Sequence, residues 1–209
     1  MTEQATATAL LDAAEAEFAE NGIDRASLRS IMRAAGANSA AVHYHYGSRE
    51  SLARAVLERI LQPLQRRRCE LLEAAVAATG RPNLDRAIDA LIRPDFEALL
   101  AAQDRDPRST RIVGAIYSRP PAFVKAMVEA SFSPVAMEFM PHLVDALPDV
   151  GAAELSWRVR WNVFGMLGAV LSSDEAQEIT HETVEAEIGR TVAAAVGALS
   201  APPTEVAVS

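Results

Sequence analysis

A run of small residues followed by three ring-bearing side chains occupies residues 39–45, where the chain reads Ser-Ala-Ala-Val-His-Tyr-His. His43, Tyr44 and His45 can each donate a hydrogen bond to an anionic oxygen such as that of a phosphate. The small side chains before them would let a helix backbone approach base edges closely. Arg49 adds a guanidinium at the start of the next helix, a position that favours anions. The chemistry that these residues offer is contact with the phosphates and bases of a nucleic acid.

Two short helices must position these groups. Ser27 can cap a helix over 28–35 that Gly36 ends, and Asn38 or Ser39 can cap a second helix that carries the histidines. Two short helices separated by a tight glycine turn have the dimensions of a helix-turn-helix, in which the second helix enters the major groove. The alternative is a small three-helix scaffold whose arginines are only solvated.

The charge distribution bears on the same question. The chain carries a net charge of −8, yet the segment from Gly22 to Arg68 holds nine arginines and three acidic residues. This segment of 47 residues therefore carries +6 and leaves −14 for the rest of the chain. Affinity for a polyanion depends on the local field, so a basic block on an acidic body fits a phosphate-contacting module. A solvated helix surface is the alternative on charge alone.

Composition restricts the class of protein. Half of the 209 residues are apolar but only 5% are aromatic, and alternating strand patterns are lacking, so we predict an all-α fold. Cys69 is the single cysteine, which leaves no intrachain disulfide and no cysteine-based zinc site. The longest apolar run, 163–171, is too short to cross a bilayer, and the N-terminus lacks the basic start of a signal peptide. These features predict a cytoplasmic protein.

Sequence motifs of enzymes are absent: there is no Gly-x-Gly-x-x-Gly, no phosphate-binding Gly-Lys-Ser/Thr, no Gly-x-Ser-x-Gly and no His-Glu-x-x-His. His43 and His45 would lie about 200° apart around a helix, so they cannot face one metal ion. His181 and Glu185 share a helix face but lack a third ligand nearby. The sequence therefore predicts a protein that is not an enzyme and that uses no metal or cofactor.

Three segments carry a resemblance to a known family. They are Leu11-Asp-Ala-Ala-Glu-Ala-Glu-Phe-Ala-Glu-Asn-Gly-Ile, Ser27-Leu-Arg-Ser-Ile-Met-Arg-Ala-Ala-Gly and Ala41-Val-His-Tyr-His-Tyr-Gly-Ser-Arg-Glu-Ser-Leu. In this order and spacing, residues 5–60 resemble the N-terminal signature of the TetR family of transcriptional regulators. The resemblance implies a homodimeric repressor whose N-terminal helices bind a palindromic operator and whose C-terminal body binds a small molecule that releases the DNA.

The family's DNA-contacting positions can be transferred to this chain one by one. His43 stands where tyrosine is usual, Ala41 where threonine is frequent and Arg49 where lysine is usual, so the resemblance does not predict the operator sequence. The DNA-binding residues that the resemblance implies are Ser27, Arg29, Asn38, Ser39, Ala41, His43, Tyr44, His45 and Arg49.

Beyond the first helices, apolar patterns divided by prolines and glycines predict further helices. We expect helices over 6–21, 48–78 with a bend at Pro63, 84–102 interrupted near Pro94, 109–117, 122–147 disturbed at Pro134 and Pro141, 152–171 and 181–199. We divide the chain into a helix-turn-helix DNA-binding domain at 1–47, a helical effector-binding and dimerisation domain at 48–200 and a flexible tail at 201–209.

A helix of seven residues touches only a few base pairs, so selecting a genomic site requires two copies related by a two-fold axis. Two apolar stripes near the C-terminal end could form the seam of a homodimer, and the alternative is an ordinary internal core. The residues predicted at this dimer interface are Leu155, Val159, Val163, Met166, Leu167, Val170, Val184, Ile188, Val192 and Val196.

Aromatic and methionine side chains between residues 84 and 161 lie among prolines that would break helices, which favours an apolar pocket. The alternative, which is the commoner one for each of them taken singly, is ordinary core. We expect a small apolar or acyl-bearing effector to be bound by Phe96, Tyr117, Phe123, Met127, Phe132, Met137 and Trp161. The stretches 40–50 and 154–161 are also similar to a subgroup of the family that includes regulators of fatty-acid metabolism.

Two alternatives stay open at this point. The chain could activate transcription, or it could be a helical small-molecule-binding protein that does not bind an operator. Salt dependence separates the second alternative, because a true operator binder loses affinity steeply as ionic strength rises and keeps its sequence preference.

Overall fold

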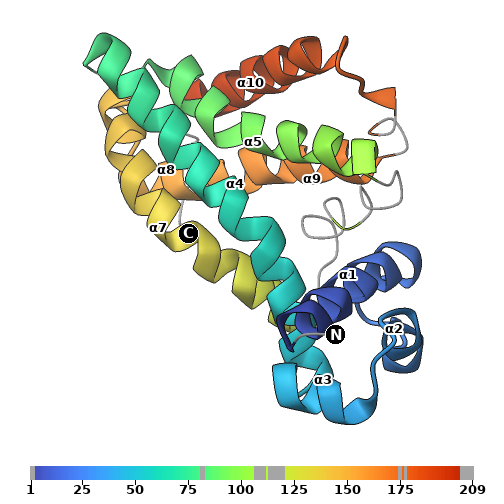
Figure 1. Cartoon of the computed structure of the whole chain (residues 1–209). Coiled ribbons are helices and arrows are strands. Elements are labelled where there is room, and N and C mark those ends of the chain that lie inside the picture. Colours follow the sequence, from blue (N-terminus) through green and yellow to red (C-terminus); the bar gives the residue numbers. More distant parts are fainter. Residues whose placement is uncertain are drawn as a thin grey trace, which may run out of the picture.

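The computed structural model describes residues 3–80, 83–105, 112, 121–173, 176 and 178–202. In this part of the chain all regular secondary structure is helical, which confirms the predicted all-α class (Figure 1). None of the described helices combines the length and apolar character that a membrane span needs. The helices are α1 (Glu3–Asn21), α2 (Leu28–Ala34), α3 (Ser39–Tyr46), α4 (Arg49–Thr79), α5 (Leu84–Arg105), α7 (Ala122–Ala146), α8 (Ala152–Arg158), the π-helical turn η2 (Val159–Val163), α9 (Phe164–Ser172) and α10 (Val184–Ser200).

Helices α1, α2 and α3 and the first half of α4 enclose one hydrophobic core. Ser27, Asn38 and Ser48 cap α2, α3 and α4 through side-chain oxygens. Gly22 and Gly36 adopt φ angles of 77° and 61°, the left-handed conformation that ends a helix without a Cβ clash. With these caps and turn glycines, the helix-turn-helix forms at the residues where the sequence predicts it. The core includes Leu10, Phe18, Ile31, Val42, Leu52 and Leu57.

Helix α4 has 31 residues and connects the helix-turn-helix to the C-terminal body (Figure 1). Its first half contributes Leu52 and Val56 to the N-terminal core, and its second half contributes Leu72 to the C-terminal core. Pro63 lies inside the helix, which continues on both sides of it. Because one uninterrupted helix packs in both cores, a displacement of α4 would be transmitted between the two parts of the chain.

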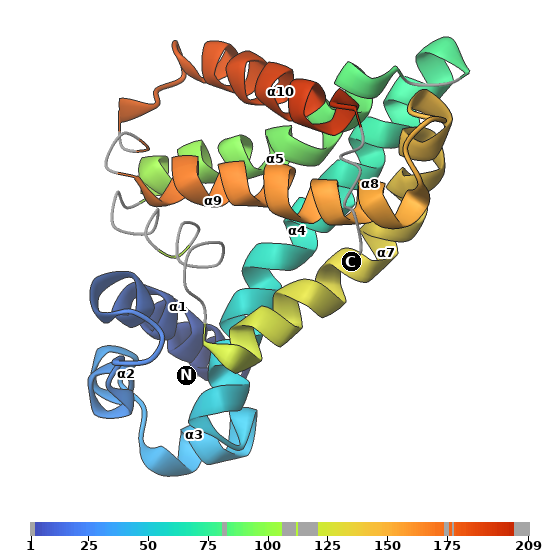
Figure 2. The ribbon, with the colours of Figure 1, turned by 180° about the vertical axis from the view of Figure 1, so that it is seen from behind.

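The C-terminal body consists of α5, α7, α10 and the run α8–η2–α9. Helix α10 packs on α5, and α7 packs along α4 (Figure 1). Seen from behind, α8 and α9 form one continuous rod that crosses this assembly (Figure 2). Residues Val159–Val163 in this rod form a π-helical turn, which inserts one extra residue and rotates the side chains that follow. The core of the body includes Phe96, Leu99, Phe139, Leu155, Leu167 and Leu199.

Three prolines lie inside helices of the body. Pro94 is in α5, and Pro134 and Pro141 are in α7, so the predicted interruptions of these helices are wrong. A proline removes one backbone hydrogen bond, but packing along both sides of a helix can hold the chain in helical conformation across that gap. The predicted helix over 109–117 lies outside the described residues except for Ile112, which is buried in the N-terminal core.

Candidate nucleic-acid interface

Side-chain caps define where helices α2 and α3 begin. Ser27 Oγ accepts a hydrogen bond from the Ser30 backbone N–H at 3.3 Å, and Asn38 Oδ1 accepts one from the Ala41 N–H at 2.9 Å. The Ser27 N–H in turn donates to the Glu17 carboxylate of α1 at 2.9 Å. Two of the predicted DNA-binding residues, Ser27 and Asn38, therefore shape the helices that would read the DNA.

One face of α3 is left open to solvent. Val42 is buried and anchors the helix, whereas Ser39, Ala40, His43 and Tyr44 are exposed. The small residues come first along the helix, so nothing bulky covers its N-terminal backbone. A helix of this kind can approach the floor of a major groove while its larger side chains reach outward.

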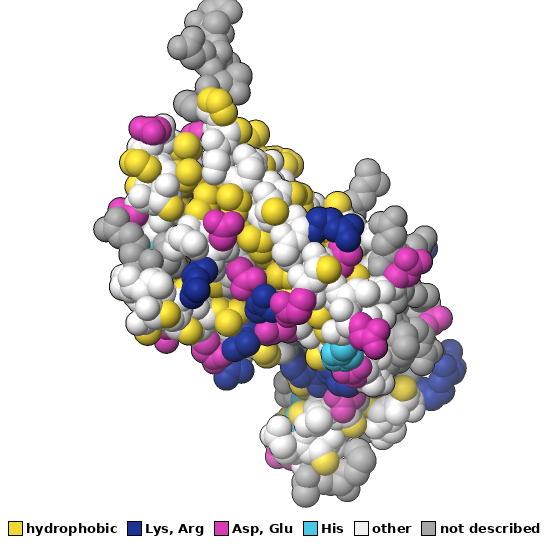
Figure 3. Space-filling model, turned by 90° about the horizontal axis from the view of Figure 1, so that it is seen from above, with side chains coloured by type: hydrophobic (Ala, Val, Ile, Leu, Met, Phe, Trp, Pro, Cys, Tyr) yellow, Lys and Arg dark blue, Asp and Glu magenta, His cyan; other side chains and the backbone are white. Residues whose placement is uncertain are grey.

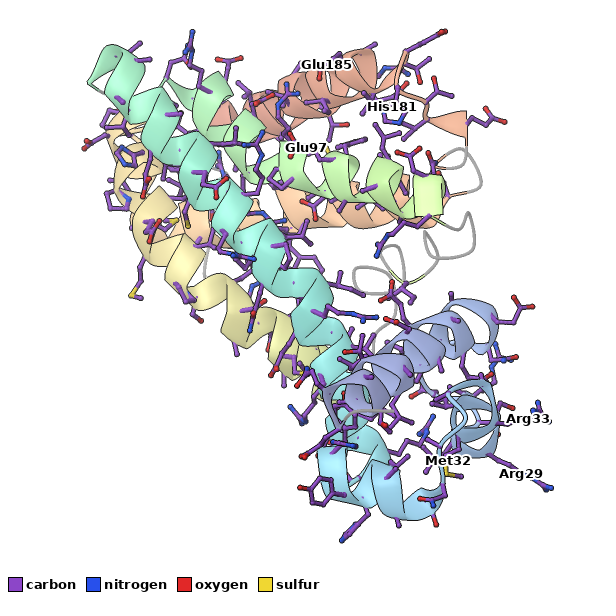
Figure 4. All side chains as sticks on the ribbon, viewed as in Figure 1. Arg29, Met32, Arg33, Glu97, His181 and Glu185 are labelled. Atoms are coloured by element: carbon purple, nitrogen blue, oxygen red, sulfur yellow. The ribbon has the colours of Figure 1, made fainter. Side chains whose placement is uncertain are left out.

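Helix α2 presents basic side chains beside α3. Arg29 and Arg33 are exposed and project from α2 away from the rest of the chain (Figure 4). Guanidinium groups in this position suit phosphate oxygens, because they stay charged and can donate two parallel hydrogen bonds. Arg29 was predicted from the family resemblance; Arg33 was missed, although its spacing of four residues from Arg29 places both on the same side of α2.

Two tyrosines tie α3 to α1. The Tyr46 hydroxyl donates to the Ala7 carbonyl oxygen at 2.8 Å. The Tyr44 hydroxyl bonds to Glu3, and this hydrogen bond, together with the carboxylate charge, raises the pKa of the Tyr44 phenol. Tyr44 is nevertheless 71% exposed, which leaves its ring free to approach DNA. Tyr46 is a positioning residue that the sequence did not indicate.

The two histidines of α3 differ in their surroundings. His43 is exposed, and its Nδ1 lies 3.0 Å from the carbonyl oxygen of Gly47, the residue that ends the helix. His45 is half-buried, and the ring of Tyr44 meets it edge-on with centroids 5.1 Å apart. His43 is therefore the more accessible of the two imidazoles.

Arg49 holds the loop between α1 and α2. Its Nη2 donates to the carbonyl oxygens of Ile23 at 2.6 Å and Asp24 at 3.0 Å. The sequence indicated a phosphate contact for this residue and gave no sign of the loop contact. A guanidinium has five N–H donors, so the two bonds from Nη2 leave other donors for a phosphate.

A second candidate site is a cavity of about 530 Å³ between α7 and the α8–η2–α9 run. Phe132 and Trp161, both predicted at the effector site, line it together with Val135, Phe139 and Phe164. The ring centroids of Phe132 and Phe164 lie 4.3 Å apart. Polar groups at this site are Lys125, Glu129 and Arg160, with Arg160 Nη1 3.9 Å from Glu129 Oε1.

The other residues predicted at the effector site lie elsewhere. Phe96 is buried in the C-terminal core, because α5 turns it inward beneath its neighbours. Phe123 and Met127 pack against the N-terminal core, at the end of α7 that reaches α4. Met137 is 73% exposed on the outer side of α7. Tertiary packing sets the faces of α5 and α7, so these four side chains do not line this cavity and their part in effector binding stays a prediction; Tyr117 lies outside the described residues.

The predicted dimer interface lies inside a single chain. Ten side chains were expected at the seam, but the two apolar stripes pack on each other and on α5, so the alternative of an internal core accounts for them. The buried members are Leu155, Val163, Leu167, Val184, Ile188 and Val192, and those half-buried against the same core are Val159, Met166, Val170 and Val196. The buried members are covered by their own chain, and the dimer interface as a whole stays a prediction.

His181 and Glu185 form no joint site. His181 Nε2 lies 3.3 Å from Asp104, whereas Glu185 pairs with Arg93 at 2.6 Å (Figure 4). The Arg93 pairing lowers the pKa of the Glu185 carboxyl. Among the residues that the structure describes, no three His, Cys, Asp or Glu side chains gather in a group that could hold a metal ion.

The fold and the open face of α3 define a class of protein: a helix-turn-helix module fused to a helical body that contains a cavity. The chain belongs to the tetR family of bacterial regulatory proteins. The model of the family's N-terminal region matches residues 10–56, and the model of the tetracyclin repressor-like C-terminal domain matches residues 89–201. Both parts of the family pattern are thus present, which confirms the resemblance drawn from the N-terminal segments.

The individual relatives that match this chain share 30% or less of its residues. The chain is 30% identical over 95 residues to the HTH-type transcriptional repressor KstR2 of Rhodococcus jostii (strain RHA1), and this match spans 46% of the chain and 44% of that protein. The fatty acid degradation regulator FadR from Bacillus halodurans has a similar structure, with a TM-score of 0.68 at 14% identity over 92% of this chain and 95% of that one. A second similar structure is that of the TetR-family regulator CifR, solved as a cysteine mutant with 26bp double-strand operator DNA. Its TM-score is 0.57 at 21% identity, and the match covers 90% of this chain and 95% of that one. At these identities the two structures support the fold alone.

Proposed function

We propose that this protein is a cytoplasmic DNA-binding transcriptional regulator that represses by binding a palindromic operator as a homodimer and is released by a small apolar or acyl-bearing effector. The observation that carries the proposal is the open face of α3, which begins with small residues, is capped by Asn38 and is flanked by the exposed arginines of α2. CifR, a relative in fold, was solved with operator DNA, which adds support for this use of the helix pair.

The assignment of Ser27, Arg29, Asn38, Ser39, Ala41, His43, Tyr44, His45 and Arg49 to the DNA interface is part of this proposal. Arg29, Ser39, His43 and Tyr44 are exposed and free to meet the duplex. Ser27 and Asn38 act mainly through the caps that they form. We add Arg33 to the set because it lies exposed beside Arg29 on α2.

A dimer is required because α3 has eight residues and is about 12 Å long, which covers only a few base pairs. Two copies would read half-sites about 34 Å apart or a multiple of that spacing. The surface available for pairing is the outward side of the α8–η2–α9 rod and of α10. Trp157 is 56% exposed there, which is unusual for a residue of this size.

Small exposed residues continue this surface and would allow two helices to approach closely. They are Ala169 on α9 and Ala193, Ala194 and Gly197 on α10. Viewed from above, hydrophobic side chains gather in one area of the C-terminal body, with a few acidic side chains among them (Figure 3). The paired surface in this proposal therefore lies on the opposite side of the same helices from the stripes that form the core.

The cavity between α7 and the α8–η2–α9 run supports an effector of mixed character. Phe132, Val135 and Phe139 supply an apolar wall, and Lys125 and Arg160 supply two cations against the single carboxylate of Glu129. A cavity of about 530 Å³ is in the size range of small-molecule sites. An apolar body that carries an acidic group matches this arrangement best.

The proposal is tested by selecting DNA from a random duplex library with the purified full-length chain. We expect an enriched two-fold-symmetric motif, a dimer in light scattering, and a steep loss of affinity with rising salt at constant sequence preference. Ser39→Glu, which places a negative charge on the open face of α3, should abolish enrichment, whereas Ser200→Glu at the far end of α10 should not. A monomer, or a library without an enriched motif, would contradict the proposal and leave the small-molecule-binding alternative.

The effector site is tested separately by calorimetry with palmitate, octanoate and their CoA thioesters. We expect heat of binding and release of the selected operator by at least one of these probes. Ala136→Trp should fill the cavity and remove the heat, while Met137→Trp, one residue further along α7 and outside the cavity, should keep it. No heat and no operator release with any probe would rule out the acyl-type effector without affecting the DNA-binding proposal.

A further inference from the structure

Helix α7 is part of both hydrophobic cores. Val124, near its start, is buried in the N-terminal core, whereas Val135 and Phe139 are buried in the C-terminal core. The start of the helix reaches the N-terminal part of the chain and packs against α4 there (Figure 2). The guanidinium carbon of Arg54 in α4 lies 5.6 Å from the centre of the Phe123 ring. Because packed cores transmit displacements, a movement of the first turns of α7 would disturb the packing of the helix-turn-helix.

The same helix forms one wall of the cavity between α7 and the α8–η2–α9 run. Three of its residues follow one another at intervals of four, which places them on one stripe of the helix. Val124 lies in the N-terminal core, Val128 packs against that core and also lines the cavity, and Phe132 lines the cavity. The N-terminal core and the cavity therefore share the side chain of Val128. Among the described residues α4 contributes none to the lining, so α7 is the direct connection between the cavity and the N-terminal core.

Pro134 follows directly after this stripe. A proline has no backbone N–H, so the bond that this residue would donate to the carbonyl four positions earlier is missing from α7. The hydroxyls of Ser131 and Ser133 donate to backbone carbonyl oxygens of the preceding turn, at 2.9 Å to Val128 and 3.3 Å to Glu129. Serine bonds of this kind often bend a helix. Both features make α7 easier to bend at this point.

We call residues 122–132, the first three turns of the helix, the α7 arm. From this arrangement, and resting on the proposed function, we propose that the α7 arm pivots at Pro134 and carries the signal of an occupied cavity to the helix-turn-helix. A ligand in the cavity displaces Val128 and Phe132, and Val124 moves with them because the helix between these residues is unbroken. The N-terminal core then holds its helices in another arrangement, and the operator is released.

Two contacts fix the position of the arm when the cavity is empty. The Phe132 ring lies against the buried guanidinium of Arg68 in α4, with 4.7 Å between the guanidinium carbon and the ring centre. Ser131 Oγ accepts a hydrogen bond from Gln65 Nε2 of the same helix at 3.3 Å, and Gln65 Oε1 accepts one from Arg68 Nη1 at 2.9 Å. The last turn of the arm is thus held by α4, and a ligand that moves Phe132 disturbs both contacts.

A ligand shifts this equilibrium only if it binds better to one position of the arm than to the other. The cavity wall beyond the pivot, with Val135 and Phe139, is buried in the C-terminal core and cannot give way. A ligand too large for the space therefore displaces the arm. Glu129 of the arm also lies 3.9 Å from Arg160 of η2, measured from Oε1 to Nη1. An acidic group on the ligand would compete with Glu129 for this guanidinium, so the ligand is bound more tightly once the arm has moved away.

The experiment measures the dissociation constant of the selected operator for the full-length protein, with and without palmitate, octanoate or one of their CoA thioesters. We expect an effective probe to weaken operator binding by the parent protein about tenfold, within the usual range of allosteric coupling. Pro134→Ala supplies the missing N–H and stiffens the pivot. This variant should still bind the probe and the operator, but the probe should weaken its operator binding by less than about twofold.

Pro141→Ala is the matched control. Pro141 is, like Pro134, an exposed proline inside α7, but Phe139 and Leu143 on either side of it both lie in the C-terminal core. No arm that reaches the N-terminal core begins at Pro141, so Pro141→Ala should keep the response of the parent protein to the probe.

A second measurement needs no effector. Ala136→Trp fills the cavity from the far side of the pivot, so it should itself weaken operator binding about tenfold, and adding Pro134→Ala should restore most of the affinity. Met137→Trp, on the outer side of α7, should leave the affinity unchanged. Hydrogen exchange of backbone amides needs no DNA either. Ala136→Trp should speed exchange at residues 122–128 and in α1, α2 and α3, and Met137→Trp should not.

Thermal unfolding of each variant shows whether the fold is retained. Operator release that Pro134→Ala leaves intact, or that Pro141→Ala removes to the same extent, would overturn the inference. Exchange in the N-terminal helices that Ala136→Trp does not change would also overturn it. If no operator is selected or no probe is bound, the corresponding part of the proposed function fails instead, and the exchange experiment still decides whether the arm connects the cavity to the N-terminal core.

Discussion

Arg68 and Asp95 form an ion pair that solvent does not reach. Arg68 Nη2 lies 2.5 Å from Asp95 Oδ2, and both side chains are 0% exposed. The same guanidinium donates to the Leu91 carbonyl oxygen at 2.8 Å and lies 4.7 Å from the centre of the Phe132 ring. One side chain thus joins α4, α5 and α7, and it lies directly behind a residue that lines the proposed effector cavity.

Removing one partner of this pair should be costly. Asp95→Asn removes the carboxylate that pairs with the buried guanidinium of Arg68, and we expect a loss of about 3–5 kcal/mol in the free energy of unfolding. Urea denaturation of the parent protein and of the variant measures this difference in the free energy of unfolding. Arg66→Met, which removes an exposed arginine from the same helix, should change stability by less than about 0.5 kcal/mol. A small effect of Asp95→Asn would show that water or another group reaches the site.

The cap of α3 can be separated from a direct DNA contact at Asn38. Asn38→Ala removes the hydrogen bond to the Ala41 N–H and should cost about 1 kcal/mol of stability. Asn38→Asp keeps the cap but adds a negative charge at the DNA face, so it should unfold like the parent protein and bind DNA more weakly. Ser39→Ala is the control for stability, because Asn38 supplies the described cap. Equal stability of Asn38→Ala and the parent would contradict the role of the cap.

Glu3 and Tyr44 should act on DNA binding in opposite directions. Glu3→Gln removes a carboxylate next to the DNA face, so operator affinity should rise, and the pKa of the Tyr44 phenol should fall towards its ordinary value. Tyr44→Phe should weaken binding to all sequences modestly if the hydroxyl contacts a phosphate. Filter binding and ultraviolet titration of the phenol measure the two effects. Unchanged affinity in Tyr44→Phe would remove the phosphate contact from the proposal.

Cys69 should be a slow nucleophile. Burial, a hydrogen bond to Glu138 and the charges of Glu138 and Glu73 raise the pKa of its thiol to about 11. A rise of about two units leaves about a hundredfold less thiolate at pH 8, so alkylation by iodoacetamide should be slower by about that factor than for a free cysteine. Because the charged form is disfavoured, the rate should still be rising at pH 9. Glu138→Gln should accelerate the reaction, and fast alkylation in the parent protein at pH 8 would contradict this account.

The sequence by itself determined the local structure of the N-terminal part. Ser27, Asn38 and Ser48 cap helices and Gly22 and Gly36 end them, as predicted from residue type and position. These signals act within a few residues, because a cap satisfies backbone groups one turn away and a positive φ is a property of one residue. The order of such signals was enough to predict the helix-turn-helix, and the family followed from the resemblance of three N-terminal segments, which the family model over residues 10–56 confirms.

Only the tertiary structure decided which side of each helix is buried. The stripes through Leu155 and Ile188 are apolar in sequence whether they face the chain's own core or a partner, and packing on α5 placed them inside. In the same way, Arg68 looks like one of three adjacent arginines until Asp95 and Phe132 come to lie against it from other helices. Residues far apart in sequence supply these neighbours, so no local pattern could reveal them.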